Sequence, residues 1–81
     1  MMRKLDEVVS GKGWETRKRI LEELISSPKT PYDLAKRLNL NYSTVRYHLD
    51  LLESSGLVTH VKEGSKQIFL PSKSLTALKI I

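Results

Sequence analysis

The chain contains no cysteine, and this absence excludes several classes of chemistry at once. Disulfide scaffolds, thiolate zinc sites and cysteine nucleophiles all depend on that side chain. No apolar run approaches the roughly 20 residues that a membrane-spanning helix needs, and no charged start followed by an apolar segment marks a secretory signal. We therefore expect a cytoplasmic protein with no membrane partner.

The chain is also short, and its length of 81 residues predicts a single domain, residues 1–81. A chain of this size buries only about 60% of its unfolded surface, which argues against a deep substrate pocket. It has two histidines, neither with a catalytic partner nearby in sequence, and no glycine-rich phosphate loop. Neither histidine has the further ligands that zinc requires. We expect no enzyme, no cofactor and no metal, and we expect oligomerisation to supplement the small core.

Positive charge is in excess, because the chain has 14 Lys and Arg against 9 Asp and Glu. Its net charge is +5 and its pI is about 9.7. The excess lies at the two ends, since residues 1–29 carry +2, residues 57–81 carry +3 and residues 30–56 are neutral. Such a balance favours an anionic partner, for which nucleic acid is the first candidate.

Hydrophobic periodicity predicts a first helix over residues 14–26, ended by Ser26-Ser27-Pro28. Its expected apolar side consists of Ile20, Leu21, Leu24 and Ile25. The cations Arg17, Lys18 and Arg19 are expected mostly in solvent, with the i,i+4 pairs Lys18–Glu22 and Arg19–Glu23. Before this helix, residues 5–9 form a short element of uncertain type.

A second helix has a well-defined start, with Thr30 at the N-cap, Pro31 at N1 and Asp33 at N3. Its apolar stripe is Leu34, Ala35 and Leu38. Asn39 tolerates the left-handed conformation at a helix end, and Asn41 is suited to cap the next helix. We therefore predict a second helix of about two turns, followed by a three-residue turn.

The third predicted helix runs from about Tyr42 to Ser55 and is closed by Gly56 at the C′ position. At 100° per residue, Val45, Leu49 and Leu52 share a buried stripe. The opposite, open side carries Ser43, Tyr47, Asp50 and Leu51, with Arg46 on its flank.

After Gly56 the hydrophobic period changes to two, which predicts strands over residues 57–62 and 67–70 around a turn at 63–66. Three helices followed by a β-hairpin have the order of a winged helix-turn-helix, an α+β fold that is mostly α. We expect its core at residues 14–70, with terminal elements at 1–13 and 71–81.

Several sequence strings carry a family resemblance: Thr16-Arg17-Lys18-Arg19-Ile20-Leu21, Asp33-Leu34-Ala35, Ser43-Thr44-Val45-Arg46-Tyr47-His48-Leu49 and Leu52-Glu53-Ser54-Ser55-Gly56-Leu57-Val58. Over about residues 14–70 the chain resembles ArsR-type winged helix-turn-helix transcriptional regulators of archaea and bacteria. Metal-sensing members carry a Cys-x-Cys where this chain has Thr30 and Tyr32, so the resemblance is to members that lack the metal-sensing cysteines.

The resemblance implies a homodimer that binds two half-sites of double-stranded DNA. The implied DNA-binding residues are Asn41, Tyr42, Ser43, Thr44, Arg46, Tyr47 and His48 on the third helix, and Lys62, Ser65 and Lys66 on the wing. Arg46 is a candidate for guanine, for a phosphate, or for a surface pair with Asp50. His48 lies nearer the core stripe, as a hydrogen-bonded boundary residue does. The candidate dimer interface is Trp14, Leu75, Leu78 and Ile81, for which packing on the core is the alternative.

A second hypothesis is a protein-interaction winged helix within transcription or replication machinery. The neutral charge of residues 30–56 supports it, and the open face of Ser43, Tyr47 and Leu51 would then meet a protein. Salt dependence separates the two hypotheses, because phosphate contacts make DNA binding strongly dependent on salt.

Overall fold

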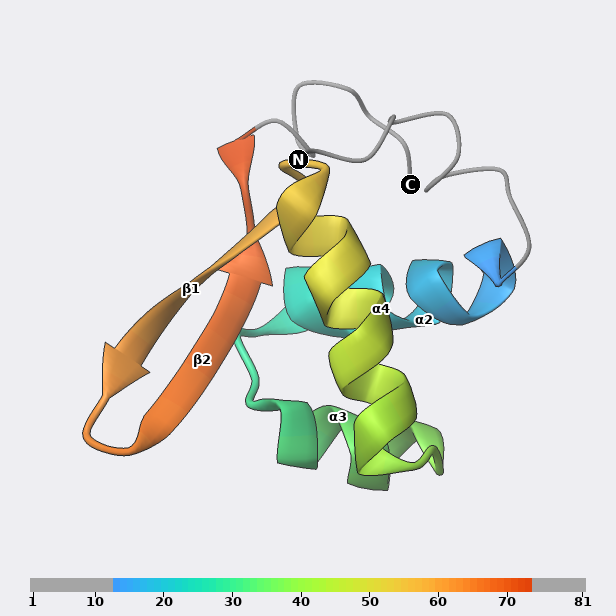
Figure 1. Cartoon of the computed structure of the whole chain (residues 1–81), viewed down its shortest axis with the longest axis horizontal. Helices are drawn as coiled ribbons and strands as arrows, with labels where there is room; N and C mark the ends of the chain where they lie inside the picture. Colours follow the sequence, from blue (N-terminus) through green and yellow to red (C-terminus); the bar gives the residue numbers. More distant parts are fainter. Residues whose placement is uncertain (1–12, 74–81) are drawn as a thin grey trace.

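The structure is a computed structural model that describes residues 13–73, and its elements have the predicted order (Figure 1). They are α2 (Trp14–Ser26), α3 (Pro31–Leu38), α4 (Tyr42–Ser54), β1 (Val58–Glu63) and β2 (Lys66–Pro71). Helix α4 ends one residue before the predicted Ser55. Strand β1 is shifted by one residue toward the C-terminus, and β2 extends one residue beyond both of its predicted ends. The winged helix-turn-helix fold is thus confirmed, while the element expected at residues 5–9 lies outside the described residues.

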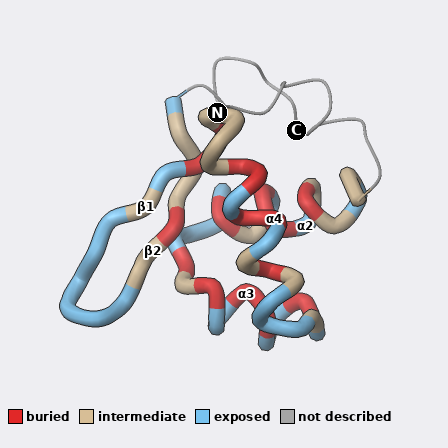
Figure 2. The backbone as a smooth tube through the Cα atoms, viewed as in Figure 1, coloured by how far each residue is buried: buried red, intermediate tan, exposed pale blue. Residues whose placement is uncertain are grey.

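The core lies where the inner faces of the three helices meet the base of the hairpin. Figure 2 shows buried residues on all three helices and exposed residues at the hairpin tip. The cluster includes the predicted stripes of all three helices; its members are Ile20, Leu21, Leu24, Leu34, Ala35, Leu38, Val45, Leu49, Leu52, Leu57, Val58 and Phe69. Trp14 and Leu40 are partly buried and pack against this cluster.

Local sequence signals fix the turn between α3 and α4. The Thr30 side chain accepts a hydrogen bond from the Asp33 backbone N–H at 3.1 Å, so the predicted N-cap is confirmed. Asn39 has φ of 56°, the left-handed conformation expected there, and the Leu40 N–H then donates to the Ala35 carbonyl at 2.9 Å. Asn41 occupies the N-cap position of α4 but makes no side-chain capping bond, unlike its predicted role.

The hairpin is antiparallel and has two different faces. Residues directly opposite each other share a face, so His60 and Phe69 lie together on the inner face and Val61 and Ile68 on the outer face. Phe69 is fully buried, whereas Val61 is 53% exposed. Gly64, at φ of 65°, occupies the tight turn between the strands.

Two backbone hydrogen bonds join β2 to the loop between α2 and α3. The Phe69 N–H donates to the Lys29 carbonyl at 2.8 Å, and the Lys29 N–H donates back to the Phe69 carbonyl at 3.1 Å. This bridge uses the free edge of β2, next to the loop between α2 and α3. In the part of the chain that the structure describes, the sheet has only β1 and β2, and the other edge of β1 has no partner strand.

Two predictions about helix faces were wrong. Ile25 was expected on the apolar side of α2 but is 53% exposed, because it lies 140° around the helix from Ile20. Leu51 was expected on the open side of α4 but is buried. The buried arc of α4 is wider than the predicted stripe, since it also includes His48, which is 60° from Leu51 on the helix.

Candidate nucleic-acid interface

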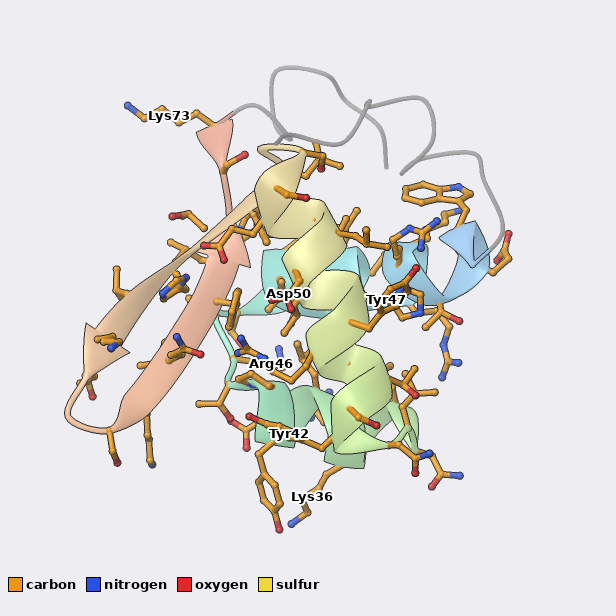
Figure 3. All side chains as sticks on the ribbon, viewed as in Figure 1. Lys36, Tyr42, Arg46, Tyr47, Asp50 and Lys73 are labelled. Atoms are coloured by element: carbon orange, nitrogen blue, oxygen red, sulfur yellow. The ribbon has the colours of Figure 1, made fainter. Side chains whose placement is uncertain are left out.

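The exposed arc of α4 and its N-cap hold part of the set of residues predicted at the interface. Tyr42 and Tyr47 are 54% and 57% exposed, and Asn41 and Ser43 are exposed beside them. In Figure 3, Tyr42, Arg46 and Asp50 lie along the side of α4 that faces the hairpin, whereas Tyr47 lies away from it. The four-residue spacing of the first three puts them on one stripe. Helix α4 therefore presents a polar and aromatic surface beside the wing.

A groove of about 480 Å³ separates the wing from the first turns of α3 and α4. It brings together the predicted wing residues and the start of the third helix; its lining is Thr30, Pro31, Tyr32, Asp33, Tyr42, Lys62, Ser65, Lys66 and Gln67. Tyr32 and Gln67 were not among the predicted site residues. Tyr32 was detectable as a large aromatic outside the apolar stripe of α3, where it is 62% exposed. Nothing in the sequence marked Gln67.

Arg46 joins α4 to the wing. One guanidinium nitrogen, Nη1, donates to the Gln67 side-chain oxygen at 2.7 Å, and the other, Nη2, lies 3.5 Å from a carboxylate oxygen of Asp50. The guanidinium carbon is 5.6 Å from the centroid of the Phe69 ring, within cation–π range. The i,i+4 pair with Asp50, one of the three predicted roles of Arg46, is thus present.

His48 faces α2 instead of the open surface of α4. Its side chain is 8% exposed, and its Nδ1 lies 3.1 Å from Arg17 Nη1. Because a guanidinium only donates hydrogen bonds, Nδ1 is the acceptor and the neutral ring carries its proton on Nε2. Burial, and then the charge of Arg17, lower the pKa of His48. The hydrogen-bonded boundary position expected for His48 is what the structure shows.

The lowered pKa of His48 predicts a loss of stability in acid. Below the usual histidine pKa of about 6.5, the unfolded chain binds a proton that the folded protein takes up only at lower pH. The contribution of His48 to stability is therefore complete above pH 6.5 and is lost as the pH falls from there through the folded pKa. Urea unfolding at pH 5.0, 6.0 and 7.5 measures this effect. His48→Gln, which keeps an acceptor for Arg17, is expected to flatten the pH dependence. If the His48→Gln profile matches the wild-type profile while the His60→Gln control flattens it, the assignment is wrong.

The predicted solvated charges of α2 are arranged differently from the expectation. Arg17 is 3% exposed, so it is not a surface cation. Glu23 pairs with Arg37 at 2.6 Å and with Lys29 at 3.6 Å, whereas Arg19 donates to the Leu38 carbonyl at 3.4 Å. The hydrogen bond from Arg37 is the main cause that lowers the pKa of Glu23. The predicted i,i+4 pair of Arg19 with Glu23 is replaced, because Lys29 from the following loop and Arg37 from α3 pair with Glu23.

His60 links β1 to α4, because its Nδ1 lies 2.6 Å from a carboxylate oxygen of Glu53. Within residues 13–73 no three histidine or acidic side chains gather as a metal-ligand set. None of the helices in that same range has the length and apolar character needed to cross a membrane.

Comparisons with known proteins agree with this geometry. The family model of bacterial regulatory proteins of the arsR family matches residues 15–60. An uncharacterized HTH-type transcriptional regulator of Methanocaldococcus jannaschii is 43% identical over 61 residues, which are 75% of this chain and 16% of the relative. The chain therefore spans only a small part of that curated relative.

Solved structures show the same fold. An ArsR-like transcriptional regulator from Rhodococcus sp. RHA1 matches with a TM-score of 0.73 and 31% identity, over 80% of this chain and 60% of that one. HlyU from Vibrio cholerae N16961 matches with a TM-score of 0.79 and 28% identity, over 94% of this chain and 79% of that one. A third match, with a TM-score of 0.79 and 23% identity, covers 91% of this chain and 66% of the other. It is a Mycobacterium bovis domain that is described as a homodimeric winged helix-turn-helix DNA-binding domain. At that identity the last likeness concerns the fold alone.

Proposed function

Because the chain belongs to the ArsR family of bacterial regulatory proteins, we propose that it is a sequence-specific transcriptional regulator that binds double-stranded DNA as a homodimer. The observation that carries this proposal is the position of the wing. Lys62, Ser65 and Lys66 line one groove with Tyr42 at the start of α4. Cationic and hydroxyl side chains thus flank a helix whose outer surface is exposed.

Helix α4 is the element proposed to enter the major groove. That groove is about 12 Å wide and admits one helix, whose side chains reach the base edges. Ser43 and Thr44 lie in the first turn, where hydroxyls and unpaired backbone N–H groups favour a phosphate. Arg46 and Tyr47 lie further along α4 and are proposed to contact bases, and Asn41 and Tyr42 are proposed to contact DNA at the start of the helix. His48 is left out, because its ring is buried against Arg17.

The wing is proposed to contact the sugar-phosphate backbone or the minor groove. Lys62 and Lys66 are exposed, as is Ser65 at the turn. The turn of the hairpin extends away from the three helices (Figure 1), which leaves it free to approach a DNA backbone. Contacts of this kind set the orientation of a protein on DNA and supply affinity for any sequence.

A two-fold dimer would place two copies of α4 in half-sites about one helical turn of DNA apart. The Mycobacterium bovis domain, which has the same fold, is itself described as homodimeric, so the fold is compatible with this assembly. Trp14, at the start of α2, packs against the core and is only partly buried, so it stays a candidate for the dimer surface. The other candidates, Leu75, Leu78 and Ile81, lie outside the described residues.

A fluorescence-anisotropy titration of labelled random duplex DNA tests the proposal, with the oligomeric state measured by sedimentation. If Lys62 and Lys66 of both protomers each contact a phosphate, the log–log dependence of affinity on salt has a slope of about −3.6, or steeper with further contacts. Absence of binding by a folded protein at low salt would contradict the proposal. The alternative, a protein-interaction module, would then become the working hypothesis, since partner binding of that kind has a flat salt dependence.

A further inference from the structure

The Arg46 guanidinium is held by groups from two different elements. Gln67, on β2, accepts from Nη1 at 2.7 Å, and Asp50, one turn further along α4, lies 3.5 Å from Nη2. The centroid of the Phe69 ring lies 5.6 Å from the guanidinium carbon. The Arg46 side chain is only 29% exposed, although it lies on the side of α4 that faces the hairpin and not in the core. An arginine that is expected to contact DNA is therefore already ordered before any DNA is present.

The two polar contacts are unequal. The Asp50 carboxylate is 65% exposed and its distance to Nη2 exceeds a good hydrogen bond, so solvent screens this pair and it contributes little. The contact with Gln67 is short and part-buried, and Gln67 is itself fixed in the hairpin ladder opposite Lys62. Gln67 is therefore the principal polar group that sets the direction of the guanidinium.

We propose that Gln67 is a positioning residue for DNA sequence recognition, which acts by holding Arg46; this inference rests on the proposed DNA-binding function. A guanidinium has five N–H donors. One is used by Gln67 and at most one more by Asp50, so at least three stay available, and a bidentate contact with guanine needs two. Because the glutamine amide carries no charge, Gln67 orders Arg46 without cancelling the positive charge that attracts DNA.

The same hydrogen bond makes the wing and α4 one recognition unit. Gln67 also lines the groove shared with Lys62 and Lys66, so a shift of the wing on the phosphate backbone moves the partner of Arg46. Contacts of the wing, which carry no sequence information alone, thereby acquire an influence on which base Arg46 selects. Sequence preference is expected to depend on a wing residue that itself carries no charge.

A double-mutant cycle on DNA affinity tests this coupling. The duplex is the best sequence selected from a random pool by the wild-type protein, and each variant is titrated against it and against random duplex. Gln67→Ala is expected to lower the preference for the selected duplex about 5- to 20-fold, with affinity for random duplex and the salt slope unchanged. In the Arg46→Ala background, which itself lowers the preference, Gln67→Ala is expected to change it less than about 2-fold. Gln67→Glu, which keeps the acceptor oxygen, is expected to retain the preference although its added charge weakens binding to every sequence.

Two controls separate positioning from simple loss of structure. Ile68→Ala, at the neighbouring position on the outer face of the hairpin, is expected to keep the wild-type preference. Urea unfolding of Gln67→Ala should show a folded protein at the temperature of the titration. If Gln67→Ala lowers the preference for the selected duplex equally in the presence and absence of Arg46, the positioning role is overturned, whereas the proposed DNA binding is not. Failure of the wild-type protein to bind any duplex would overturn both this role and the proposed function.

Discussion

Replacing Phe69 with alanine is expected to lower the free energy of unfolding by about 3–5 kcal/mol, the range for a fully buried phenylalanine. The Phe69 side chain has 0% exposure and is the largest of the fully buried side chains. Its backbone forms both hydrogen bonds of the bridge to Lys29, so it fixes β2 against the loop between α2 and α3. Because small domains are marginally stable, this loss is a large fraction of the total.

Urea unfolding followed by far-ultraviolet circular dichroism measures the effect. Ile68→Ala is the matched control, since it removes an apolar side chain from the adjacent position on the outer face, which is only partly buried. We expect that control to cost less than about 1.5 kcal/mol. Similar losses for the two variants would mean that the hairpin does not pack on the core through Phe69.

The second large effect is expected at the wing. The double substitution Lys62→Ala with Lys66→Ala should weaken binding to selected and random duplexes alike, by about 10- to 100-fold at low salt. It should also make the log–log salt slope shallower by about 1.8 per protomer, since each phosphate contact contributes about 0.9. The physical reason is the release of fewer counterions when fewer cations approach the DNA backbone.

Lys73→Ala controls for the general loss of positive charge. Lys73 is exposed, and Figure 3 places it at the end of the hairpin remote from the turn. Measured beside Lys66→Ala, which changes the net charge by the same amount, Lys73→Ala should leave the slope within error of wild type. An equal change in slope for the two single variants would indicate long-range attraction alone and would remove the wing from the interface.

Local signals in the sequence were sufficient to predict most of the fold. The Thr30 cap, the left-handed Asn39 and the positive φ of Gly56 each depend on residues adjacent in sequence, and the structure has all three. Helix faces were less predictable. The exposure of Ile25 and the burial of Leu51 depend on how wide an arc the neighbouring elements cover, and a stripe on one helix does not contain that information.

The candidate site was predictable as a set of positions but not as a set of contacts. The sequence placed Arg46 on the third helix and Lys66 in the hairpin, although Lys66 opens β2 instead of ending the turn. Only the hairpin register brings Gln67 to Arg46, 21 residues away. Likewise the burial of Arg17 follows from a partner 31 residues later, His48. A single glutamine in a predicted strand belongs to no sequence motif. Neither the hydrophobic period nor the spacing of charged residues therefore indicates that Gln67 contacts Arg46.

Within residues 13–73, one edge of β1 has no partner strand, and this gives the charges on β1 a second consequence. An exposed strand edge carries open backbone N–H and C=O groups that can pair with the same edge of another molecule. Val61 is an apolar side chain on that strand, and Lys62 and Glu63 come directly after it. Charged side chains on an edge strand oppose such pairing. Lys62, which is proposed to contact the DNA backbone, is thus also expected to oppose edge-to-edge aggregation, and this limits how far the charge of β1 can be removed without loss of solubility.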